Sequence, residues 1–267
     1  MLNFLRELIY QTKKRFYKIF KKDQNIYLIY SMGKVGSSAI YNSIKKQIPY
    51  ADVFHVHFLS DNWLKKILPT LDSVFHVNIK IGNKINSYLK KNPNRKIKII
   101  TLTREPIIRE VSNIFENWKH LYQNIEKVDK LELKRRLDEN DFDFTLNWFD
   151  TEFKEFLGFD IYDYKFDKES GYDIYEYNSM EILCIKQEDL REVGEKALKE
   201  FIGKNILLKD ANKTANKKGN NLYSFLKNNY KTSNERLNTL YSSKYIKHFY
   251  SEDELSVFKK KWNANSI

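Results

Sequence analysis

The chain has 267 residues, of which 42% are hydrophobic, so it can build a substantial core as one large domain or two small ones. Its net charge of +12 favours anionic partners, while only 8 glycines and 4 prolines argue against a many-turned all-β sandwich. The single cysteine, Cys184, excludes a disulfide framework or a cysteine-based zinc cluster, and no apolar run approaches the ~18 residues of a membrane span.

The amino-terminal segment, residues 1–22, is more basic than the rest of the chain. Between its basic residues, apolar side chains recur at helical spacing, which predicts a basic amphipathic helix over residues 2–20. Such a helix suits the surface of an anionic membrane, the body of the protein or a partner, and these alternatives stay open. The segment lacks the uninterrupted apolar core and the cleavage site of a secretory signal, so we expect a cytoplasmic protein, with peripheral membrane contact as one alternative.

The remainder, residues 23–267, is predicted to form a single domain in which strands and helices alternate. Expected strands cover 25–30, 51–59 and 95–103, and a later pair surrounds Asn178-Ser179 as a hairpin. In the first half of this domain, helices are expected over 37–47, 61–68 and 78–91, and another opens at Pro106. A polar and aromatic helical region follows at 129–157, and further helices are expected over 189–202, 222–229, 234–247 and 252–262. This order predicts an α/β fold, a parallel sheet flanked by helices with a helical carboxyl-terminal region.

The stretch "SMGKVGSS", residues 31–38, joins the first strand to the first helix of this domain through a glycine turn. A helix that begins directly after a strand points unpaired N–H groups at whatever lies above the strand end, and its dipole favours negative charge. With Lys34, Gly36, Ser37 and Ser38 at the bend, the natural guest is a phosphate or sulfate group. The lysine comes too early for a Walker nucleotide loop and no G-x-G-x-x-G is present, so an ordinary turn with a solvated lysine is the alternative.

A second motif follows the third strand, in "TLTREPIIREVSNIFENW", residues 101–118. Arg104 lies at the strand end and Ser112 eight residues later, in the next helix. Together with the glycine turn, this pair resembles the sulfotransferase superfamily, whose donor is 3′-phosphoadenosine 5′-phosphosulfate. The resemblance implies a P-loop-like fold that needs no metal. It also implies that the turn from Lys34 through Val35 to Ser38 grips the 5′-phosphosulfate, and that Arg104 and Ser112 hold the 3′-phosphate.

Two later stretches extend the resemblance. Residues 181–203 resemble the late strand of that superfamily, with its acidic turn at Glu188, Asp189 and Leu190. Residues 241–262 resemble a bacterial branch, the NKWYS-type capsular polysaccharide synthesis proteins, although the nearest stretch to that signature, "NKKGNNLYS", has no tryptophan. The branch implies a capsular or surface glycan as acceptor. By the same resemblance, Lys217, Lys218 and Gly219 would close over the adenosine and its 3′-phosphate.

Sulfuryl transfer requires a cation at the leaving oxygen and a base for the acceptor hydroxyl. Lys34 would supply the cation. His57 is the preferred base and His55 the second choice, because they share one face of the second strand and histidine suits proton removal at neutral pH. Both can also be structural. Weaker candidates are His76 and Glu116 as base, Lys80 for substrate binding and Arg109 for the 3′-phosphate.

The sequence therefore predicts a sulfotransferase that uses 3′-phosphoadenosine 5′-phosphosulfate, releases 3′,5′-adenosine bisphosphate and acts on a glycan hydroxyl. The aromatic-rich helices at 115–122 and 142–164 offer stacking faces for sugar rings, or form ordinary core. One rival is an ATP-dependent kinase of the same fold, and another is a non-catalytic, membrane-associated protein of capsule assembly. A nucleic-acid partner is not expected, because the positive charge follows no recognisable reading motif.

Overall fold

The computed structural model describes residues 5, 7–9, 11–12, 25–61, 65, 73–116, 128–209 and 220–264. These residues build a five-stranded sheet in the order β2-β1-β3-β5-β4. Four strands are parallel, and the edge strand β4 pairs antiparallel with β5 as a hairpin. The strands are β1 (Ile26–Tyr30), β2 (Asp52–Val56), β3 (Ile97–Thr103), β4 (Tyr172–Tyr177) and β5 (Met180–Lys186). The predicted α/β class with a mostly parallel sheet is confirmed.

The strand order determines where a ligand can bind. All five residues of β1 are buried, and its two neighbours are β2 on one side and β3 on the other. The chain therefore runs from β1 to its neighbour β2 on one side, and then crosses to β3 on the other side of β1. In open parallel sheets, a crevice forms at this reversal, outside the carboxyl ends of the strands. The loops that follow β1 and β3 meet there.

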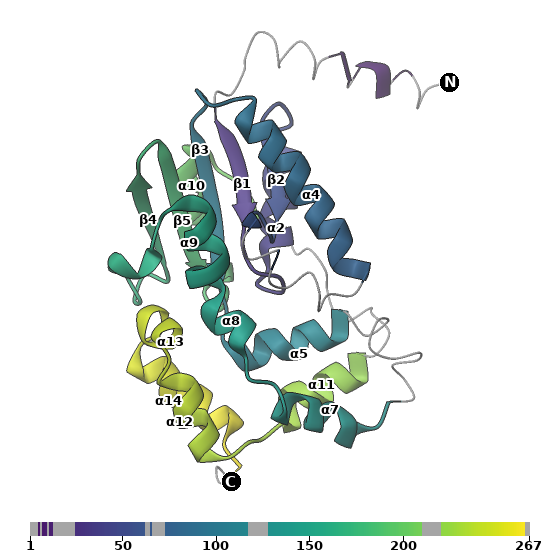
Figure 1. The fold of residues 1–267 in the computed structure, drawn as a ribbon, viewed down its shortest axis with the longest axis vertical. Helices are drawn as coiled ribbons and strands as arrows, with labels where there is room; N and C mark the ends of the chain where they lie inside the picture. The colour runs from purple at the N-terminus through teal and green to yellow at the C-terminus, as the bar shows by residue number, and fades with distance from the viewer. Residues whose placement is uncertain are drawn as a thin grey trace.

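Helices surround the sheet. Helix α2 (Ser37–Gln47) and α4 (Ser73–Lys90) contact β2, while α10 (Leu190–Ile202) contacts β4 and β5. Helix α5 (Pro106–Glu116) begins at the proline after β3, where a missing N–H costs nothing. Figure 1 shows α5 and the helices near the carboxyl terminus beyond the ends of the parallel strands.

Two regions predicted as single helices are broken. Residues 129–157 form α7 (Lys130–Asp138), α8 (Asp143–Trp148), a π-helical turn η3 (Phe149–Phe153) and α9 (Lys154–Leu157). Before α8, the side chains of Asn140 and Asp141 accept hydrogen bonds from backbone N–H groups two residues on, which competes with helix formation.

The second broken region lies near the carboxyl terminus. Residues 234–247 divide into α12 (Asn234–Tyr241) and α13 (Lys244–Phe249), because Ser243 caps the new helix by accepting from the N–H of Ile246. On either side lie α11 (Asn220–Asn229) and α14 (Glu252–Trp262). Most of the predicted helix 61–68 lies outside the described residues, as do residues 210–219.

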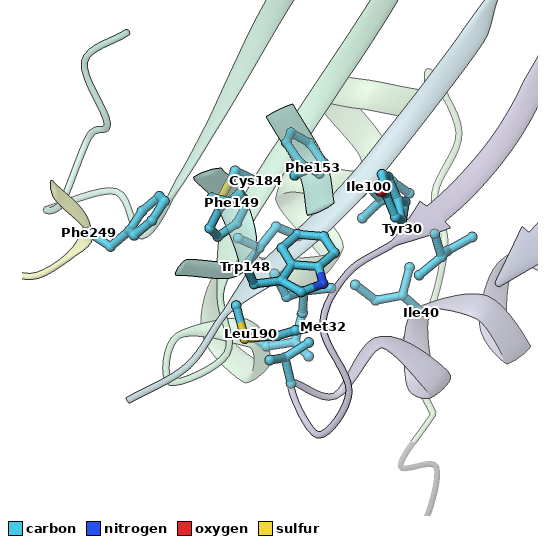
Figure 2. Close-up of a cluster of buried hydrophobic side chains, with 14 of the residues drawn as sticks. Tyr30, Met32, Ile40, Ile100, Trp148, Phe149, Phe153, Cys184, Leu190 and Phe249 are labelled. Carbon is cyan, nitrogen blue, oxygen red and sulfur yellow. The ribbon is translucent and has the colours of Figure 1, made fainter. Parts of the chain in front are cut away.

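Aromatic side chains close the core at the carboxyl end of β1. Tyr30 stacks on Phe153, with ring centroids 5.4 Å apart, and meets Trp148 edge-on at 5.3 Å. Figure 2 shows these rings packed together, with Phe149 and Cys184 beside them. Large buried side chains of this kind each contribute about 1.5–3 kcal/mol to stability. Since these rings of the 142–164 region are buried, they serve the core and not the stacking of sugars.

In the described part of the chain, no helix is long and apolar enough to cross a membrane. The amino-terminal segment is described at residues 5, 7–9 and 11–12, which are helical. There, Leu5, Leu8 and Ile9 expose about half of their surface, at 51%, 56% and 49%.

Candidate functional site

The loops that follow β1 and β3 touch directly at the strand-order reversal. The guanidinium of Arg104 donates from Nη1 to the carbonyl oxygen of Lys34 at 2.6 Å and to the hydroxyl of Ser112 at 3.0 Å. The hydroxyl of Ser112 in turn donates to the carbonyl of Ile108, one helical turn earlier. The structure therefore brings the glycine turn, Arg104 and Ser112 into one place.

The backbone of the glycine turn is tightly constrained. Lys34 and Gly36 both have left-handed conformations, with φ of 72° and 84°. A side chain at Gly36 would be strained, and its Cβ would lie 3.4 Å from side-chain atoms of Gln187 and Leu190. The side chain of Val35 is completely buried, so only the backbone of this residue can face a ligand.

The two helices that begin at this edge of the sheet differ at their amino-terminal ends. Helix α5 is capped by its own preceding residue, because the carboxylate of Glu105 accepts from the N–H groups of Ile107 at 2.9 Å and Ile108 at 2.8 Å. Helix α2 begins at Ser37, directly after Gly36, which has no side chain to cap the helix, and its first turn has no acidic residue. The positive end of α2 is therefore suited to an external anion.

Arg104 is held by its backbone and leaves part of its guanidinium available. The hydroxyl of Tyr245, on α13, accepts from the Arg104 N–H and donates to the Arg104 carbonyl, both at 2.9 Å. Nη1 is engaged with Lys34 and Ser112, but the buried Nε has no hydrogen-bond partner among the described residues. A buried N–H without a partner costs about 1–3 kcal/mol, which an anionic acceptor would offset.

Arg109, the alternative arginine, has a different position. Its Nε donates to the carbonyl of Gly33 at 3.1 Å, its Nη1 pairs with Glu110 at 2.9 Å, and its guanidinium lies 4.7 Å from the centre of the Phe144 ring. Burial lowers its pKa. Arg109 therefore supports the backbone of the glycine turn at Gly33, and its guanidinium pairs with Glu110.

The two histidines of the second strand lie together, with ring centroids 4.8 Å apart. His57 follows the last residue of β2 and donates from Nδ1 to the carbonyl of Ser31 at 2.7 Å. Because a carbonyl only accepts, the neutral ring carries its proton on Nδ1, and Nε2 is an acceptor. Burial lowers the pKa of His57 to about 4, and the charges of Lys34 and Arg109 also lower it.

His55 is more fully engaged. Its Nε2 forms a hydrogen bond with the hydroxyl of Ser37 at 2.9 Å, and its ring stacks on Tyr41 with centroids 5.4 Å apart. Burial, the neighbouring His57 and the ammonium of Lys34 lower its pKa to about 3. Both histidines are therefore uncharged at neutral pH, and both lie close enough to Lys34 for its charge to affect them.

Several residues that the sequence suggested for the site have no described contact with it. Lys217, Lys218 and Gly219 fall outside the described residues, as do the side chains of His76 and Glu116. Lys80 is exposed on α4. The proposed roles of these residues stay predictions.

Some residues of the site have contacts that the sequence did not predict. Glu188, at the end of β5, accepts from the N–H of Glu105 at 2.8 Å and from the hydroxyl of Tyr250 at 3.2 Å, and burial raises its pKa to about 7. Lys261 of α14 has a pKa lowered by burial, with Lys227 and Arg104 contributing, so these cations lie near one another. The sequence signals were the acidic turn that includes Glu188 and the position of Glu105 before Pro106, which is typical of a helix start.

Comparison with protein families gives one match. A family model described as "Putative capsular polysaccharide synthesis protein" matches residues 123–251, a little under half of the chain. The matched range includes β4, β5 and the helices up to α13, and it excludes both the glycine turn and Arg104. Searches of curated proteins and of solved structures gave no match.

Proposed function

We propose that this chain is a sulfotransferase of P-loop-like fold, which moves a sulfuryl group from 3′-phosphoadenosine 5′-phosphosulfate to a hydroxyl of a glycan. The observation that supports it most is the contact of Arg104 with both Ser112 and the carbonyl of Lys34. It brings the guanidinium of Arg104 against the backbone of Lys34, at the ends of the neighbouring strands β3 and β1. A nucleotide with anionic groups on both its 5′ and 3′ oxygens matches two such positions.

In this proposal, the residues of the glycine turn bind the reacting end of the donor. The N–H groups at the start of α2 and the hydroxyls of Ser37 and Ser38 donate to its phosphosulfate oxygens, while the Ser37 oxygen accepts from Nε2 of His55. Lys34 balances the charge that develops on the bridging oxygen as the bond from sulfur to the phosphate oxygen breaks. The oxygen of the acceptor hydroxyl forms the new bond to sulfur, and its proton passes to a base.

His57 is the base that the geometry favours. Its Nδ1 is fixed as a donor to Ser31, which leaves Nε2 to take the proton, whereas Nε2 of His55 is bound to Ser37. A pKa near 4 makes the resting imidazole a weak base. The negative charge of a bound donor would offset the effect of Lys34 and raise the pKa of His57 when the substrate is present.

The glycan acceptor is proposed from the family match alone, because the matching model is described by capsular polysaccharide synthesis. The rival kinase requires ligands for magnesium beside the glycine turn. The carboxylates of Glu105 and Glu188, at the neighbouring strand ends, already accept hydrogen bonds from backbone N–H groups and tyrosine hydroxyls. This engagement favours the sulfotransferase.

A membrane-bound position is a separate proposal, and it does not depend on catalysis. Leu5, Leu8 and Ile9 lie exposed on a helix whose segment carries an excess of Lys and Arg. Apolar side chains on one face and cations on the other suit the surface of an anionic bilayer.

Calorimetry tests the proposed function by comparing 3′,5′-adenosine bisphosphate with ATP and magnesium. We expect binding of the bisphosphate, weakened about tenfold or more by Lys34→Ala and by Arg104→Ala. Lys199→Ala and Arg135→Ala are matched controls, because both side chains are exposed on other helices and their loss should leave the affinity unchanged. Binding of magnesium ATP alone would support the kinase, and binding of neither would support a non-catalytic role.

A further inference from the structure

Glu152 is a buried acidic residue that the proposed reaction does not use. It lies in the π-helical turn η3 and is completely inaccessible to solvent. Its Oε1 accepts hydrogen bonds from the hydroxyl of Tyr30 at 2.6 Å, from the N–H of Ser60 at 2.9 Å and from the N–H of Leu59. Burying a carboxyl group is costly, and these three donors offset that cost.

The donors belong to the two segments that form the hydrogen bond of His57. Tyr30 directly precedes Ser31, whose carbonyl accepts from His57 Nδ1. Leu59 and Ser60 follow His57 by two and three residues. One carboxyl oxygen therefore joins the end of β1 to the loop after β2, on both sides of the bond that orients the imidazole.

Other contacts hold the same loop from the opposite side. The glycine of α4, Gly82, approaches so closely that a Cβ there would lie 2.4 Å from the carbonyl oxygen of Phe58. Asn86 of α4 donates to the carbonyl of Leu59 at 3.1 Å. The loop is thus enclosed between α4 and η3, and η3 also bonds the end of β1 through Glu152.

The π-helical geometry is part of this arrangement. Within η3, the N–H of Lys154 donates to the carbonyl of Phe149, five residues earlier and not four. Such turns insert one residue into a helix and often occur at functional sites. Here the inserted turn carries the carboxyl group that reaches both strand ends.

We propose that Glu152 is a positioning residue, which fixes the imidazole of His57 for proton transfer by bridging Tyr30 to the loop at Leu59 and Ser60. This inference rests on the proposed function only for its kinetic consequence. Accepting hydrogen bonds does not require a charge on Glu152. Burial raises its pKa to about 7, with Glu155 also raising it and the three donors lowering it, and Oε1 accepts in either protonation state.

The variants follow from the two oxygens of Glu152. Because Oε2 has no partner among the described residues, Glu152→Gln keeps the accepting oxygen, whereas Glu152→Ala removes the bridge. Tyr30→Phe removes only the link to β1 and keeps the ring packing, so it serves where the alanine variant fails to fold. Glu155→Ala is the matched control, since Glu155 accepts from the side chain of Ser60, at 2.9 Å, and its loss leaves the bonds of Glu152 in place.

The first readout is the titration of His57, followed by NMR of labelled imidazole groups, which needs no activity. We expect the pKa of His57 to stay near 4 in the wild type, Glu152→Gln and Glu155→Ala proteins, and to rise towards 6.5 in Glu152→Ala and, in part, in Tyr30→Phe. An unchanged titration in the last two, or an equal rise in Glu152→Gln, would overturn the inference.

The second readout separates this inference from the proposed function. For sulfuryl transfer, we expect Glu152→Ala to lower kcat by roughly tenfold to 100-fold, with the affinity for 3′,5′-adenosine bisphosphate unchanged and with rescue by Glu152→Gln. Loss of nucleotide affinity in place of kcat would contradict positioning. If the wild-type protein neither binds the bisphosphate nor transfers sulfate, the proposed function fails, and the histidine titration still decides the structural claim.

Discussion

The neutral state of His57 makes stability depend on pH in a way that a single substitution isolates. His57→Asn removes the titrating group, while the asparagine amide can still donate to the carbonyl of Ser31. Because burial lowers the pKa of His57 to about 4 in the folded state, the unfolded chain, with a pKa of about 6.5, takes up protons first as the pH falls. The stabilising contribution is present above pH 6.5 and is lost as the pH falls towards 4.

The magnitude follows from these two pKa values. The loss of stability from His57 is about 0.8 kcal/mol at pH 6 and about 2 kcal/mol at pH 5. Glu152 and Glu188 act in the opposite direction, because their pKa values are raised to about 7, so their contribution is present at low pH and is lost as the pH rises. His55 acts in the same direction as His57. Subtracting the variant from the wild type largely cancels these three groups.

Urea unfolding of both proteins between pH 5 and pH 8 measures the effect. We expect the difference in free energy of unfolding, wild type minus His57→Asn, to be constant above pH 7 and to fall by about 2 kcal/mol at pH 5. Parallel profiles at all pH values would mean that His57 titrates normally in the folded protein. That result would refute the reasoning that the ring is a buried, uncharged acceptor.

Three further predictions concern the nucleotide site and the amino-terminal helix. Arg104→Ala removes charge-assisted hydrogen bonds worth about 1.5–3 kcal/mol each, whereas Ser112→Ala removes one worth about 1 kcal/mol. Calorimetry should therefore show a far larger loss of affinity for 3′,5′-adenosine bisphosphate in Arg104→Ala than in Ser112→Ala. Equal losses would argue against a phosphate on Arg104. Gly36→Ala places a side chain at φ 84°, so it should lower the unfolding free energy by about 1–3 kcal/mol in urea, and an unchanged midpoint would contradict the strain. Leu8→Glu should reduce sedimentation with vesicles containing phosphatidylglycerol about tenfold and leave bisphosphate binding unchanged, whereas undiminished sedimentation would reject the membrane contact.

Local patterns were enough to predict the strands and the glycine turn, whereas the pairing of Arg104 with Ser112 was implied by the resemblance to sulfotransferases. The structure places the side chains of these two residues 3.0 Å apart. The hairpin at Asn178-Ser179 and the end of α10 at Gly203 also follow from turn and cap residues.

The parts that could not be predicted depend on contacts between distant segments. Glu152 and Tyr30 are 122 residues apart, and a lone glutamate in a polar helical stretch carries no signal of burial. The π-helical turn breaks the 3.6-residue period on which helix prediction depends. The break of the helix at Ser243 was visible as a serine before a helical run, but the apolar spacing through it favoured one continuous helix.

A crystal structure with bound 3′,5′-adenosine bisphosphate would test the proposed donor site most directly. We expect the 5′-phosphate at the start of α2 beside Lys34, and the 3′-phosphate within hydrogen-bonding distance of the Arg104 guanidinium and the Ser112 hydroxyl. A nucleotide bound elsewhere on the protein, or one that leaves Arg104 and Lys34 without contact to either phosphate, would contradict the proposal.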